Sequence, residues 1–128
     1  TAEAEGPRQL VEQALRAYFR LMVEDPAAFR LLTDKANVDD DELGGAIRRV
    51  EEALVAAIDP LIDAGLDDEH RFVLAGGMLG MAEGASMAWL ARPRDDRGTA
   101  LERRAEADRI AQRVADLMWA GLRAVHAD

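Results

Sequence analysis

Residues 72–90 form a run of nineteen positions that contains a single charged side chain, Glu83, and this run constrains the fold more than any other segment. Four glycines interrupt it, at positions 76, 77, 80 and 84. Each glycine in a helix interior costs about 1 kcal/mol relative to alanine, so some contact must offset that cost. Gly77, Gly80 and Gly84 share a helical face on which another backbone can approach closely. We therefore predict tight helix packing on this face, as in a soluble bundle.

The composition of the whole chain favours helices. Among its 128 residues there are 25 alanines and 15 leucines, against eight valines, four isoleucines and three threonines. Alanine and leucine are strong helix formers, whereas strands favour β-branched and aromatic residues. The length is that of one domain with a core of its own. These features predict an all-α domain that covers residues 1–128.

Helix-breaking and capping residues divide the chain into five segments. Pro7 suits the first turn of a helix, and Asp25 and Asp67 suit N-cap positions. Pro60 should kink the third helix, and Gly65 should cap it. The predicted helices are Pro7–Glu24, Pro26–Asp34, Asp41–Ala64, Asp68–Ala91 and Thr99–Val125.

The sequence offers no sign of a metal site or of catalysis. It has no cysteine, and its two histidines are 56 residues apart, so we predict neither a metal nor a cofactor. The acidic connector around residues 34–42 fails the calcium-loop pattern, because Asp39 stands where glycine is needed. No nucleophile triad or pair of acid and base carboxylates is recognisable. A small helical enzyme that depends on Glu83 is the remaining catalytic alternative.

Charge and hydropathy limit the partners. The net charge of −9 opposes binding to nucleic acid phosphates, so this chain alone should not bind duplex DNA. No apolar run approaches the roughly 18 residues that span a bilayer, and no signal peptide is recognisable. We therefore predict a cytoplasmic protein with no membrane partner.

The fourth and fifth predicted helices carry more apolar surface than five short helices can cover. A homodimer in which these two helices of each copy form a four-helix interface would cover it. The alternative is that the first and third helices cover everything in a monomer. Glu83 lies on an apolar face, so it needs either an arginine of the second copy or a ligand. The candidate dimer residues are Val73, Gly77, Gly80, Gly84, Ala88, Ile110, Val114, Leu117 and Gly121.

Two segments resemble the C-terminal effector-binding domain of TetR (tetracycline-repressor) family transcription regulators. The first is Leu79–Ala85 (LGMAEGA), with Trp89 and Leu90 closing the same helix. The second is Ala115–Leu122 (ADLMWAGL). The order of the predicted helices is also similar. The resemblance spans nearly the whole chain, although its motifs are degenerate helix-packing patterns.

The resemblance implies a dimer built on the last two helices, a ligand cavity in each subunit, and an N-terminal helix-turn-helix domain that binds operator DNA. Nothing before Pro7 can form that domain. Because the chain also begins at Thr1 without methionine, we expect it to be the regulatory half of a longer bacterial repressor.

The implied effector is small and hydrophobic, either neutral or cationic, because no basic cluster is evident in the sequence. The alternative is a helical interaction module without a ligand, in which the methionines and aromatic residues simply fill the core. The candidate ligand-binding residues are Phe19, Met22, Leu54, Ile58, Met78, Met81 and Glu83.

Overall fold

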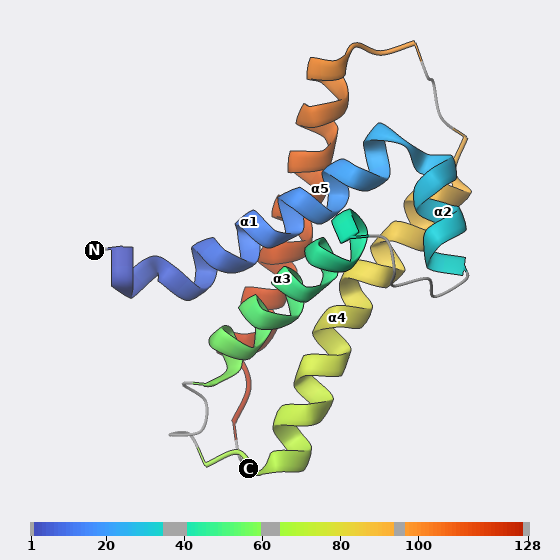
Figure 1. The fold of residues 1–128 in the computed structure, drawn as a ribbon. Coiled ribbons are helices and arrows are strands. Elements are labelled where there is room, and N and C mark those ends of the chain that lie inside the picture. Colours follow the sequence, from blue (N-terminus) through green and yellow to red (C-terminus); the bar gives the residue numbers. More distant parts are fainter. Residues whose placement is uncertain (1, 35–40, 60–64, 94–96, 127–128) are drawn as a thin grey trace.

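The computed structural model describes residues 2–34, 41–59, 65–93 and 97–126 and is all-helical over these ranges, which confirms the predicted fold class. Its five helices are α1 (Ala2–Glu24), α2 (Pro26–Asp34), α3 (Asp41–Ile58), α4 (Asp68–Ala91) and α5 (Ala100–Arg123) (Figure 1).

Capping side chains set several of these boundaries as predicted. The Asp25 carboxylate accepts a hydrogen bond from the Ala28 amide at 3.1 Å, and Asp67 accepts one from the His70 amide at 2.8 Å. Thr99 and Glu102 form a reciprocal capping box at the start of α5, which the sequence analysis missed. Each cap satisfies an amide that a helix terminus otherwise leaves without a partner.

Two predicted boundaries are wrong. Helix α1 begins at Ala2 and contains Pro7, because the preceding alanines and glutamates are good helix formers and extend it by more than a turn. Helix α3 ends at Ile58 and not at Ala64, just before a proline that disfavours continued helix. The predicted kink at Pro60 lies outside the described residues. Gly65 has a left-handed φ of 83°, which glycine adopts readily, but it lies seven residues beyond Ile58, so the prediction that it caps α3 is wrong.

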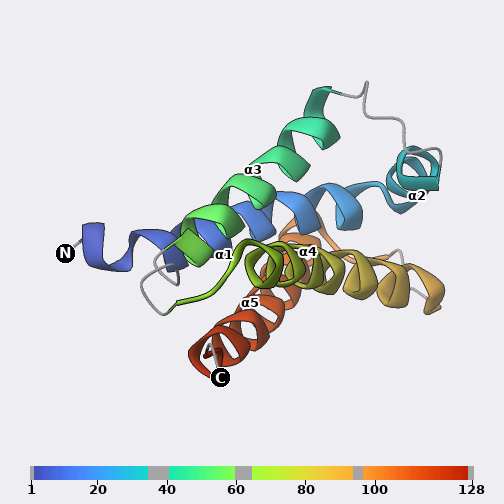
Figure 2. The same cartoon turned by 90° about the horizontal axis from the view of Figure 1, so that it is seen from below.

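Helix α1 occupies the centre of the molecule. It packs chiefly against α5 and α3, while α4 packs mainly against α3. Figure 2 shows α1 running between α3 on one side and α4 and α5 on the other. Leu15, Phe19 and Met22 of α1 are completely buried and form the middle of the core.

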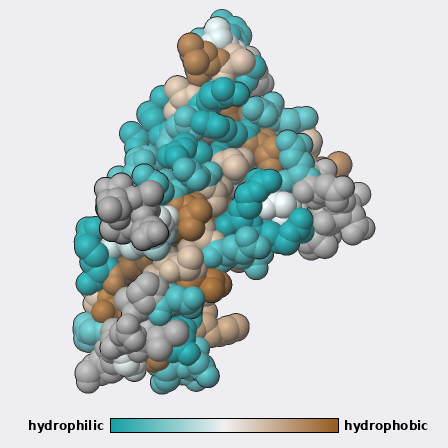
Figure 3. Space-filling model, turned by 60° about the vertical axis from the view of Figure 1, so that its left-hand side comes forward, coloured by the Kyte–Doolittle hydropathy of each residue, from teal (hydrophilic) through white to brown (hydrophobic). Residues whose placement is uncertain are grey.

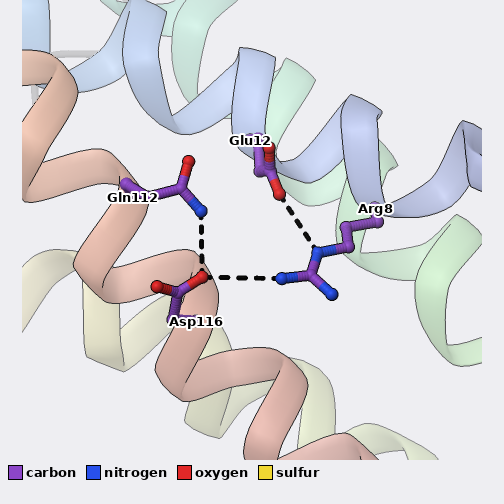
Figure 4. A network of polar contacts seen from close by, with 4 residues as sticks. All are labelled: Arg8, Glu12, Gln112 and Asp116. Atoms are coloured by element: carbon purple, nitrogen blue, oxygen red, sulfur yellow. Dashed lines mark hydrogen bonds and ion pairs between the residues drawn. The ribbon is translucent and has the colours of Figure 1, made fainter.

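Two polar groups join α1 to α5. The Arg20 guanidinium makes two hydrogen bonds of 3.0 Å to the Asp108 carboxylate. Figure 4 shows the second group, in which Arg8 lies 3.2 Å from a Glu12 oxygen and 3.6 Å from an Asp116 oxygen. Gln112 donates to the same Asp116 oxygen at 2.9 Å. Because most of these side chains are partly exposed, they set the alignment of the two helices more than the stability.

A buried polar pair joins α1 to α4. The hydroxyl groups of Tyr18 and Ser86 are hydrogen-bonded at 3.2 Å, and Ser86 also donates to the Ala82 carbonyl at 2.8 Å. Burial raises the pKa of Tyr18 above its ordinary value of 10.0; the hydrogen bond to Ser86 opposes this shift, and the negative charge of Glu83 adds to it. The pair fixes how α4 lies along α1.

Candidate interaction surface and ligand sites

The side of α4 that faces away from the core is apolar and exposed. Its buried side consists of Met78, Ala82, Ser86 and Leu90. Val73 and Met87 on the opposite side are 60% and 71% exposed. The outer face of α4 is defined here as Val73, Gly76, Gly77, Gly80, Gly84, Met87 and Ala88, all of which are exposed.

Within the part of the chain that the structure describes, the glycines of the outer face contact no other element. An added Cβ atom at Gly76, Gly77, Gly80 or Gly84 would meet no atom within 4 Å beyond its own helix. The predicted close approach of another backbone is therefore absent within this chain. The alternative that the first and third helices cover everything is also wrong, because α1 and α3 lie on the opposite side of α4.

The candidate residues of α5 divide between the core and the surface. Val114 is buried and Ile110 is partly buried against the core, whereas Leu117 is 59% exposed and Gly121 is exposed. Hydrophobic side chains also reach the surface between hydrophilic ones on the side of the molecule drawn in Figure 3. The structure thus places Leu117 and Gly121 where a second chain can contact them, and Val114 where it cannot.

Glu83 is exposed at the edge of the outer face and does not lie with the other candidate ligand residues. Within the described ranges it has neither an ion pair nor a hydrogen bond. Phe72 and Met87, two apolar side chains of the same helix, are 79% and 71% exposed. The described residues therefore provide no partner for the Glu83 carboxylate.

The six apolar candidate ligand residues do come together, inside the core. Phe19 and Met22 are 0% exposed, and the candidates from α3 and α4 pack around them. Met81 is only partly buried against this cluster. None of the six lines any of the three hollows described below. A cavity among them remains a prediction.

The largest of these hollows, of about 580 Å³, lies at another place. It is bounded by the turn between α1 and α2, the end of α4 and the first turns of α5. The Trp89 indole forms one wall and donates a hydrogen bond of 3.0 Å from Nε1 to the Glu106 carboxylate. Sequence reasoning missed this site, because its residues come from three separate parts of the chain.

No group of three or more histidine, aspartate or glutamate side chains is placed to hold a metal ion in the part of the chain that the structure describes. The acidic connector lies largely outside that part.

The indole nitrogen of Trp119 is buried and has no hydrogen-bond partner among the described residues.

Helix α4 is long and apolar enough to cross a membrane by length and composition, with a mean hydropathy of 1.2 over 18 residues. The expectation that no apolar run approaches this length is therefore wrong. Alanine, glycine and methionine raise the average without forming an unbroken run of large apolar residues. A single helix of this kind is weak support for a membrane span, because apolar helices of soluble proteins pass the same test.

No family model and no solved structure matches the chain.

Proposed function

We propose that this chain is the ligand-sensing and dimerisation domain of a bacterial transcription regulator, a repressor similar to the TetR family. In this proposal the protein is cytoplasmic, α4 and α5 pair with those of a second copy, and operator DNA is bound by an N-terminal helix-turn-helix domain outside this sequence. The observation that carries the proposal is the outer face of α4, which is apolar, rich in glycine and uncovered.

Glycines at these positions have a cost that only a partner can offset. Gly80 and Gly84 weaken the helix by about 1 kcal/mol each relative to alanine. Because no atom of another described element lies within 4 Å of a Cβ at either position, the benefit of their small size is expected to come from another molecule. In a two-fold dimer one patch meets the same patch of the second copy, so a groove of glycines lets two α4 backbones approach.

Charge is compatible with the same pairing. Glu83 is the single charged residue of the segment 72–90. Arg109 and Arg113 are exposed on α5. In a four-helix interface α5 of the second copy lies beside α4, where either arginine can neutralise Glu83.

The test of the dimer is sedimentation velocity at micromolar concentration. The parent should sediment as a dimer, and Gly80→Leu should shift it to monomer by overpacking the contact. Gly6→Leu is the matched control, since it makes the same change on α1 at a position that also has open space. A monomeric parent would contradict the proposal, as would a Gly80→Leu variant that stays dimeric.

In the proposal this chain does not itself bind DNA, for two reasons. Its net charge is −9, and its sequence has no recognisable basic recognition helix. This chain should give no specific mobility shift with duplex DNA. The coding frame upstream of Thr1 should encode about 50 to 60 residues with a helix-turn-helix pattern. A start codon adjacent to Thr1 would count against the regulator.

The closed core favours a second candidate, a helical dimerisation module that senses no ligand. Leu54 and Ile58 are 2% and 4% exposed, so a ligand among them needs space that the core would have to open. Apolar effectors distinguish the two functions. A compound that raises the melting temperature of the parent but not of Leu54→Trp supports the sensor, and the absence of any such shift supports the module.

A further inference from the structure

The hollow beside Trp89 belongs to a group of three that share their walls at one end of the molecule. Glu24 and Arg103 line the first and second, while Pro26, Arg92 and Pro93 line the first and third. The largest has a volume of about 580 Å³, which is within the range of about 300 to 1,000 Å³ that small-molecule sites occupy.

One wall of this hollow is flat, apolar and held in place. The Trp89 indole is partly buried, and its hydrogen bond of 3.0 Å to Glu106 fixes the orientation of the ring. Val23, Pro26 and Pro93 extend the apolar surface beside it. A planar ring can stack on such a wall with little loss of side-chain freedom in the protein.

The carboxylates that line the hollow already have interactions. Asp25 accepts the Ala28 amide as the N-cap of α2, and Glu106 accepts the Trp89 indole. Glu24, which is exposed, lies where its charge stabilises the Arg20 guanidinium. Each of these three carboxylates therefore has an interaction within the chain, although each keeps its negative charge.

The guanidinium groups that line the hollow have N–H donors that make no hydrogen bond within the described residues. Arg103 donates one hydrogen bond, from Nη1 to the Gly98 carbonyl at 2.6 Å, which holds its side chain and leaves most of its N–H groups available. Within the described ranges Arg92 has no side-chain partner, and neither has Arg104 in the adjoining hollow. Arg92 comes from the end of α4 and Arg103 from α5, so the fold brings two guanidinium groups, which are eleven residues apart in the sequence, to the wall of one hollow.

From this arrangement we propose that the hollow binds a small aromatic carboxylate. Its ring lies on the Trp89 indole, and its carboxylate accepts hydrogen bonds from Arg92 and Arg103. The site is separate from the core residues expected to hold an effector and does not depend on the dimer. It also departs from the expectation of a neutral or cationic ligand.

The test uses the two tryptophans of the chain, which give two indole N–H signals in an ¹H–¹⁵N NMR spectrum. Trp89→Phe assigns them. Titration of the parent with 4-tert-butylbenzoate should shift the Trp89 signal in a saturable way and leave the Trp119 signal in place. The neutral probe 4-tert-butylbenzamide and the cationic probe 4-tert-butylbenzylamine should bind at least about tenfold more weakly, because they lack the anionic acceptor.

Variants test whether Arg92 and Arg103 bind the carboxylate of the ligand. Arg92→Gln and Arg103→Gln should each weaken binding of 4-tert-butylbenzoate by about tenfold. Arg48→Gln, which replaces an exposed arginine of α3 that lines none of the three hollows, should leave it unchanged. Arg92 is exposed at the end of α4, so its replacement should leave the Trp119 signal and the fold intact even if Arg103→Gln disturbs the α5 start. The proposal is overturned by a Trp89 signal that does not move, by equal binding of the amide, by tighter binding of the amine, or by an Arg92→Gln variant that binds like the parent.

Discussion

Replacing Gly80 and Gly84 together with alanine should strengthen the fold of the single chain and weaken the dimer. An added methyl group at either position meets no atom within 4 Å beyond the helix itself. In the isolated chain the substitution therefore removes the backbone freedom of glycine and creates no clash. In the proposed dimer the same two methyl groups stand where a second backbone must approach.

The two effects have opposite signs and similar sizes. Each glycine-to-alanine change in a helix interior should stabilise the monomer by about 0.5–1 kcal/mol, so the pair should contribute about 1–2 kcal/mol. For a domain of this length that corresponds to a rise of about 3–10 °C in melting temperature. Overpacking of a close helix contact costs about 1–3 kcal/mol. The dimer dissociation constant should accordingly rise by about tenfold or more.

Urea unfolding should be followed at protein concentrations below and above the dimer dissociation constant, with sedimentation equilibrium on the same samples. Gly45→Ala on α3 is the control, because its Cβ would make only ordinary contacts of 3.8 Å and it lies outside the outer face. It should stabilise the fold and leave the dimer unchanged. Loss of stability in monomeric Gly80→Ala/Gly84→Ala would refute the reasoning that the face is open. A gain in stability with an unchanged dissociation constant would refute its role in the dimer.

Three further predictions concern the core and its links. Leu54→Trp should lower the free energy of unfolding in urea by about 1–3 kcal/mol, because Leu54 is 2% exposed and the core has to move to accept an indole; unchanged stability would show that free space exists there. The raised pKa of Tyr18 predicts a loss of stability as the pH rises above 10, where the unfolded chain releases the phenol proton that the folded chain retains; urea unfolding between pH 9 and 11 should show this slope, and Tyr18→Phe should remove it. Asp108→Asn should destabilise by about 1 kcal/mol at most, since Arg20 and Asp108 are each 37% exposed, and the difference from the parent should shrink in 1 M salt, which a melting series at two salt concentrations can check.

Local chemistry explains why the helices could be predicted closely. Asp25, Asp67 and Thr99 are capping residues whose hydrogen bonds involve neighbours three positions along the chain, so the sequence contains both partners. The errors arise where local signals conflict. At Pro7 a proline that usually opens a helix follows residues that already favour one, and the helix forms through it.

The sites could be predicted only in part, because they depend on long-range placement. The apolar run of residues 72–90 correctly indicated a helix, and the rest of the described chain leaves Val73 and Met87 of that helix exposed. Which residues of α5 face outward depends on how α1 lies against it, so Leu117 and Val114 could not be separated in advance. The hollow beside Trp89 is lined by side chains from α4, from α5 and from the turn before α2. No spacing pattern in the sequence predicts that these residues lie close together.

The pairing of α1 with α5 also determines when the chain can fold during its synthesis. Arg20 and Asp108, which bond across these helices, are 88 residues apart. The buried centre of α1 therefore waits for α5, the last of the five helices, to leave the ribosome before it can be covered, and closure of so long a loop slows that step. Until then the apolar faces of α1 and α4 are exposed together, which makes the nascent chain a target for chaperones that bind apolar segments. Of the five helices, the one that the finished domain places at its centre is thus synthesised before the others and waits longest for its partners.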